Sequence, residues 1–224
     1  MTADRLCMEK EPLIAAPGRR AQRGFTLVEV IVVLSVVLLL TGIAVPMLSS
    51  YMEDGRRARA EAECKVVAAA VMSFYKDVGV YPARNGSGTN DTVRSLFTGP
   101  TTPTTSPWKA NHNWITWGTS ATLGDLLDNH LLRNTPQGSS GGAYPSTGTM
   151  RWRGPYLNGS SPVDPWGRPY VINVIASYFN NATTHKRLWV ISAGPNGIFD
   201  TSVRATATTE ITGDDIGVML SQRP

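Results

Sequence analysis

Residues 23–30 read Arg23-Gly24-Phe25-Thr26-Leu27-Val28-Glu29-Val30. An apolar run follows, and no residue in it is charged until Glu53. As a helix rising about 1.5 Å per residue, this run would be roughly 35 Å long, enough to cross a hydrocarbon core of about 30 Å. The stretch therefore predicts one membrane-spanning helix near the start of the chain.

The motif at the start of this run resembles that of the type IV pilin-like superfamily. Precursors in that family carry a basic leader ending in Gly, then Phe-Thr-Leu and a Glu four residues past the Phe. Gly24, Phe25 and Glu29 match these positions. In that family, a prepilin peptidase cuts the precursor after the Gly and methylates the new terminal amine. The resemblance implies a leader of residues 1–24 and a cut between Gly24 and Phe25.

Glu29 gives the motif a physical reason. A carboxylate inside an apolar span costs about 2.5–3.5 kcal/mol on insertion scales, so it requires a cation as a partner. Residues four apart on a helix are neighbours, and the terminal ammonium of a processed Phe25 is such a cation. That ammonium could belong to the same chain or to an adjacent subunit. We therefore expect Glu29 to act in assembly.

An ordinary signal anchor or signal peptide is the alternative interpretation of this segment. A cleaved signal peptide would have an apolar region of about 7–15 residues followed by a small-residue cleavage site, whereas this run is longer and has Glu near its start. A lipoprotein anchored at Cys7 does not fit, because no apolar run precedes that cysteine. The resemblance implies a periplasmic C-terminal part, and the charges do not decide, since Arg56 and Arg57 beyond the span offset the basic leader.

The composition fits a globular part with one membrane segment, since 42% of the 224 residues are apolar and 17% are charged. The formal net charge is +4, without a dense basic face interleaved with aromatics, so nucleic acid is not an expected partner. The cut would separate the two cysteines, Cys7 and Cys64. The mature chain would then hold one thiol and no internal disulfide.

Two helix-weakening residues, Gly42 and Pro46, lie four positions apart in the span. Proline removes a backbone donor, and glycine lowers the helix preference. They predict either a simple kink or, as similar proteins suggest, local melting that lets subunits repack during assembly.

Residues 53–78 predict an amphipathic continuation of the same helix. Its apolar residues recur at steps of three and four: Ala60, Cys64, Val67, Val71, Phe74 and Val78. This face should pack on a globular head, with Cys64 as a small core residue rather than a reactive thiol. Gly79 and Pro82 should end the helix.

Residues 83–150 are rich in Gly, Ser, Thr, Asn and Pro, and they predict a long loop insertion. Only Leu123 to Arg133 predicts a short helix. Three tryptophans either pin this insertion to the head or form an exposed partner patch: Trp108, Trp114 and Trp117.

Two strands are predicted at residues 170–175 and 188–192, and they should form a hairpin. Turn residues precede the first strand in Asp164-Pro165-Trp166-Gly167-Arg168-Pro169-Tyr170. This segment and the earlier Gly154-Pro155-Tyr156-Leu157 resemble the head of the major pseudopilins of type II secretion systems. The resemblance covers residues 19–82 and 151–217.

Two later stretches, residues 193–200 and 212–217, combine Gly-containing turns with oxygen side chains, a composition that suits Ca²⁺. Their spacing does not match an EF-hand loop. Major pseudopilins fold a similar loop around a calcium ion, so the resemblance implies Asp214 and Asp215 as ligands, with Asp200 and Asn196 as further candidates. Solvated turn aspartates, with Asp214 capping a short helix, are the alternative.

The sequence contains no catalytic motif, and His112, His130 and His185 have no motif partners. We therefore predict a structural protein rather than an enzyme. The expected fold is α+β and pilin-like: a long N-terminal helix packed on a C-terminal antiparallel sheet. Residues 25–52 should lie in the membrane or the filament core, and residues 53–224 should form the head.

The resemblance implies a single-pass subunit of the bacterial inner membrane that joins a short periplasmic filament for protein export. The implied partners are copies of itself in a helical filament, minor pseudopilins, the prepilin peptidase and the inner-membrane assembly platform. A type IV pilus subunit is the close alternative. A membrane-anchored periplasmic enzyme or binding module is the alternative from another class.

Overall fold

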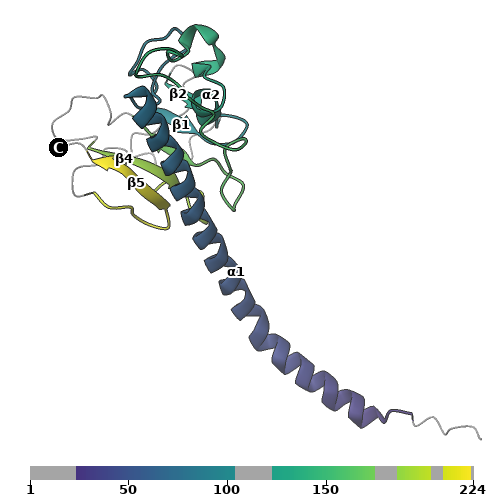
Figure 1. Ribbon diagram of the computed structural model, residues 1–224. Helices are drawn as coiled ribbons and strands as arrows, with labels where there is room; N and C mark the ends of the chain where they lie inside the picture. Colours follow the sequence, from purple (N-terminus) through teal and green to yellow (C-terminus); the bar gives the residue numbers. More distant parts are fainter. Residues whose placement is uncertain (1–23, 104–122, 175–185, 203–208, 223–224) are drawn as a thin grey trace, which may run out of the picture. The chain divides into compact units, whose positions relative to one another are not determined.

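The computed structural model describes residues 24–103, 123–174, 186–202 and 209–222. It contains one long helix, a five-stranded sheet and a few short helices (Figure 1). The elements are α1 (Leu27–Val78), β1 (Ser95–Phe97), β2 (Gly124–Leu126), α2 (Leu127–Leu131), the 3-10 helices η3 (Pro136–Gly138) and η4 (Ser140–Gly142), β3 (Val171–Asn173), β4 (Arg187–Ser192) and β5 (Ile216–Gln222). The chain divides into two compact units, Met1–Leu48 and Ser49–Pro224.

The first unit carries the start of α1. Its apolar side chains are exposed on every side, including Val28 at 68% and Leu38 at 71%. This part of α1 is long and apolar enough to cross a membrane. The helix is continuous across Gly42 and Pro46, so these residues do not end it.

The second unit contains the rest of α1, which is amphipathic as predicted. The six predicted apolar positions are all buried, and the charged residues of the helix, such as Arg59 and Lys65, lie at its surface. Cys64 is a buried free thiol, and burial raises its pKa to about 12, so it is a core residue rather than a nucleophile. The helix ends at Val78, where predicted, and Gly79 adopts a left-handed φ of +79° just after it.

The sheet has the strand order β2-β1-β3-β4-β5. The predicted hairpin is confirmed, since β3 and β4 pair antiparallel with Val171 opposite Ile191. β5 pairs antiparallel with β4 along its length, and the two strands lie side by side in Figure 1. The pair β1–β2 is parallel, so the sheet is mixed rather than wholly antiparallel. The α+β pilin-like fold itself is confirmed.

Successive strand residues point to opposite faces of the sheet, which gives the head two apolar clusters. Ile172 and Val190 belong to the larger cluster, together with the buried face of α1. Val171, Ile191 and Phe199 belong to a smaller cluster, which holds no residue of α1.

The prediction of loop structure for residues 83–150 is only partly right for the part that the structure describes. This part contains β1, β2 and α2, and Leu96, Leu127 and Leu131 are fully buried. The predicted helix over Leu123–Arg133 is also too long, because its first residues form β2 against β1 and only Leu127–Leu131 is helical. Trp108, Trp114, Trp117, His112 and His185 lie outside the described residues.

Candidate functional site

The first turn of α1 is built by Thr26, the residue before the helix. Its hydroxyl oxygen accepts the backbone N–H of Glu29 at 3.2 Å, and its carbonyl accepts that of Val30 at 3.2 Å. Thr26 and Glu29 thus have the spacing of a capping box, which marks a helix start. Thr26 belongs to the motif, and its spacing from Glu29 alone indicates that the helix begins at Leu27.

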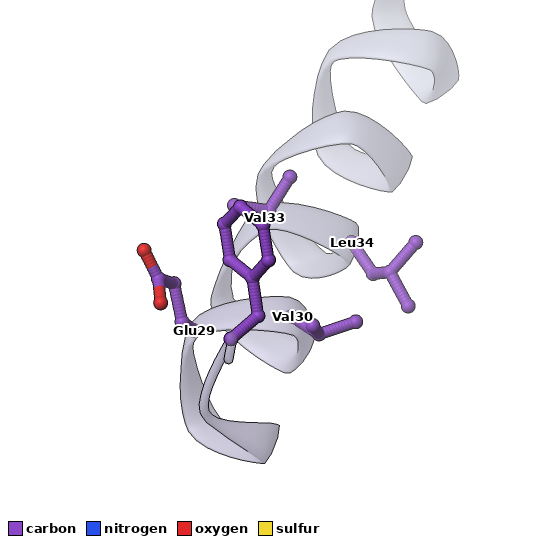
Figure 2. A pocket seen from close by; sticks show the side chains of 5 residues that line it. Glu29, Val30, Val33 and Leu34 are labelled. Carbon is purple, nitrogen blue, oxygen red and sulfur yellow. The ribbon is translucent and has the colours of Figure 1, made fainter. Parts of the chain in front are cut away.

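The Glu29 carboxylate lies on a helix face that is otherwise apolar. With Phe25, Val30, Val33 and Leu34 it lines a shallow hollow on the helix surface (Figure 2). Among the residues that the structure describes, no Lys, Arg or His lies within ion-pair distance of Glu29. A molecule that covers this face and buries Glu29 would have to supply the missing positive charge.

The four predicted metal-binding residues lie in two loops that contact each other after β4. The Asn196 amide nitrogen donates to Asp214 Oδ1 and lies 3.5 Å from Asp200 Oδ2. The backbone N–H of Asn196 donates to Asp214 Oδ2 at 2.9 Å. The structure therefore brings Asn196, Asp200 and Asp214 together.

Asp215 has a different place from the other three. Its Oδ2 accepts the backbone N–H groups of Asp200 at 2.9 Å and Thr201 at 2.7 Å, so it ties the two loops together. Its Oδ1 is buried without a hydrogen-bond partner in the described part of the chain. Burial raises the pKa of this carboxyl to about 6. Within the described ranges, no three His, Cys, Asp or Glu side chains are placed to hold a metal by themselves.

Comparison with known proteins finds two family matches along the chain. Residues 19–45 match the prokaryotic N-terminal methylation motif, and residues 127–209 match the type II secretion system protein G family. The type II secretion system core protein G of Escherichia coli (strain K12) is 26% identical over 176 residues, which are 79% of this chain and 83% of that protein. These matches support a type IV pilin-like major pseudopilin.

A second relative is a fimbrial protein, EcpC of Eikenella corrodens. It is 32% identical over 69 residues, which are 31% of the pseudopilin and only 45% of the fimbrial protein. The pilus alternative is therefore not favoured over a subunit of the type II secretion system. No solved structure matches the chain.

The family matches indicate a structural, membrane-anchored subunit with a single span, and they imply a pseudopilus and a prepilin peptidase. The protein G match begins at residue 127, inside the predicted insertion. This agrees with the structure, in which α2 belongs to the packed head. The pseudopilin head is therefore less interrupted than its sequence suggests.

Two tyrosines of the pseudopilin-like segments fix the head to the second half of α1. The Tyr170 hydroxyl donates to Glu63 Oε2 at 2.6 Å, and the Tyr156 hydroxyl donates to Asp77 Oδ2 at 3.1 Å. Burial is the main cause that raises the pKa of both phenols, so they remain hydrogen-bond donors. At both positions, a hydroxyl on a packed ring reaches a carboxylate of the helix.

A buried chain of close polar contacts joins Asp125, His130 and Tyr144 around α2. His130 Nε2 is 2.9 Å from Asp125 Oδ2, and its Nδ1 is 2.8 Å from the Tyr144 hydroxyl. All three side chains are at most 5% exposed, so they attach α2 to the core and face no solvent. Sequence reasoning missed this arrangement because its three residues share no motif.

Proposed function

We propose that this pseudopilin is the filament-forming subunit of a periplasmic pseudopilus, inserted in the inner membrane with its head in the periplasm. The observation that carries the proposal is the Glu29 carboxylate on an apolar helix face, one turn from Phe25. A chain cut after Gly24 begins with the Phe25 ammonium, the cation that this face requires. The pairing can occur within one chain or between adjacent copies, and it would set the register of subunits in a filament.

The other proposed partners follow from this role. Copies of the chain would pack their exposed helices together, and minor pseudopilins and the inner-membrane assembly platform would start and drive the filament. Protein export would result from growth of the filament as a piston or scaffold. A protease added to cells with a permeabilised outer membrane should digest the head, because the proposal places the head in the periplasm. A protected head would contradict this orientation.

Processing at Gly24 is the first test. A side chain at position 24 would meet no described atom within 4 Å, so the fold does not require glycine there. A narrow peptidase site before the cut would require it, so Gly24→Ala should be cut better than Gly24→Leu, which should accumulate as a longer precursor. Mass spectrometry of the membrane form should find N-methylated Phe25 as the first residue. A mature chain that starts elsewhere would refute the proposed cut.

We also propose that the two loops of residues 193–200 and 212–217 bind Ca²⁺. The Asn196 amide nitrogen contacts both Asp200 and Asp214, and Asp215 holds a buried oxygen without a hydrogen-bond partner in the described structure. Buried carboxylate oxygens of this kind call for a donor or a cation. These four residues would hold the ion, which would neutralise the aspartates and connect the loops.

The calcium proposal predicts a stability difference in the full chain. Calcium that binds only the folded head should raise the melting temperature of the detergent-solubilised protein with increasing saturation. The double variant Asp214→Ala, Asp215→Ala should lose this gain. Equal melting temperatures in millimolar calcium and in chelator would refute the calcium site and leave the filament proposal standing.

A further inference from the structure

The side chain of Arg168 brings a positive charge into the loop that follows β4. Its Nη2 donates to the carbonyl oxygens of Gly194 and Pro195, the latter at 3.3 Å. Its Nη1 occupies the place that a side chain at position 197 would take, and Gly197 has a left-handed φ of +75°. The guanidinium therefore fills the inside of this turn, and only glycine at position 197 leaves room for it.

Arg168 is itself held by Asp164, at the start of the same turn. Asp164 Oδ1 accepts the backbone N–H of Arg168 at 2.7 Å and that of Trp166 at 3.1 Å. The guanidinium Nε lies 3.8 Å from Asp164 Oδ2, and the Asp164 side chain is fully buried. The turn of residues 164–168 therefore has a structural role, because it directs the Arg168 side chain toward the later loop.

Asp164 also reaches the later loop through a second connection. Its Oδ2 accepts the Ser192 hydroxyl at 2.7 Å, and the Ser192 oxygen accepts the backbone N–H of Gly194 at 3.2 Å. The N–H and the carbonyl of Gly194 are thus both bound, the first by this hydroxyl and the second by Arg168. Asp164 and Arg168, two charged residues of one turn, thus fix the start of the loop of residues 193–200.

We propose that Arg168 is a positioning residue for the loop of residues 193–200. By holding the carbonyls of Gly194 and Pro195, it would keep Asn196 directed at Asp214 and prepare the loop for a cation. An ordered loop loses less conformational freedom on binding, so its metal affinity is higher. If charge repulsion between Arg168 and a metal dominated instead, Arg168 would lower the metal affinity of the loop. The metal part of this proposal rests on the calcium proposal, and the ordering of the loop does not.

The test compares Arg168→Met and Arg168→Lys with the wild type, in the full chain in detergent micelles. Arg153→Met is the matched control, because Arg153 lies beside Asp77 of α1 rather than beside the loop. Hydrogen–deuterium exchange without metal reports loop order, and calorimetric titration with CaCl₂ reports affinity. Arg168→Met should speed exchange in residues 193–200 and weaken calcium binding about tenfold. Arg168→Lys should restore part of the loop order and part of the calcium affinity. The control Arg153→Met should change neither the exchange nor the affinity.

The outcomes separate the two proposals. If the wild type binds no calcium, the calcium site is refuted, and the exchange data alone decide the role of Arg168. Exchange that stays unchanged in the loop of Arg168→Met, or rises equally across the whole head, would overturn the positioning role. Calcium affinity that is equal or higher in Arg168→Met would overturn its metal part.

Discussion

At the scale of single residues, the chain uses carboxylates for different tasks according to what surrounds them. Glu63 and Asp77 accept tyrosine hydroxyls, and Asp164 organises a turn. Glu29 differs, because its surroundings are apolar side chains of its own helix and it lies on the surface of an isolated chain. A carboxylate in this position has a structural use only when another molecule covers it.

Replacing Glu29 should therefore separate membrane insertion from assembly. Glu29→Gln removes a charge from the apolar span, so insertion should be retained. Filament formation should be lost, because the terminal ammonium of a neighbouring subunit would lie unpaired in an apolar bundle. Glu53→Gln is the control, since Glu53 lies on the same helix beside Arg56 and Arg57. Membrane fractionation and electron microscopy of overexpressed filaments measure the two steps, and normal filaments from Glu29→Gln would contradict the role of Glu29.

At the scale of elements, α1 changes its surroundings along its length. Its first part is apolar on all sides, whereas its second part buries one face in the head. Neighbouring residues in the second part can therefore contribute very different amounts to the stability of the head. Val66 is 59% exposed, and Val67 is fully buried in the main cluster.

This pair gives a matched test of the packing. Val67→Ala should lower the free energy of unfolding of the head by about 2 kcal/mol, because it leaves a cavity against the sheet. Val66→Ala should change it by less than about 0.5 kcal/mol, because that side chain faces outward. Urea unfolding followed by tryptophan fluorescence would measure both. Equal effects of the two changes would show that the packed face of α1 is assigned wrongly.

The elements also show what the sequence could and could not predict. The helix and the β3–β4 hairpin have periodic apolar residues, and both were predicted. β1 and β2 have three residues each, and Gly124-Asp125-Leu126 has no local strand signal, since its pairing with β1 decides its conformation. The motif at Gly24–Glu29 is local and was predicted, whereas the positions of Asn196 and Asp200 relative to Asp214 depend on contacts between distant loops.

At the scale of the whole molecule, the chain consists of two units that carry different tasks. Every buried apolar residue in the described ranges lies at or beyond Ala60, in the unit Ser49–Pro224. The unit Met1–Leu48 contributes none of them. The head thus obtains its stability from residues of its own, and the first part of α1 is left to lipid or to other subunits.

A fragment of residues 49–224 should therefore fold without the rest of the chain. It keeps the complete buried face of α1, both apolar clusters and the tyrosine contacts to Glu63 and Asp77. We expect it to be soluble, to unfold in one cooperative transition, and to have the melting temperature of the head in the detergent-solubilised full chain, within a few degrees. Circular dichroism at matched calcium concentration would compare the two. A second fragment that starts at residue 66 is the control, because it removes Ala60, Glu63 and Cys64 from the packed face and should be strongly destabilised. If the fragment 49–224 were unfolded while the full chain is folded, the first part of α1 would be shown to support the head, and its exposed apolar face would need another explanation than membrane and filament contacts.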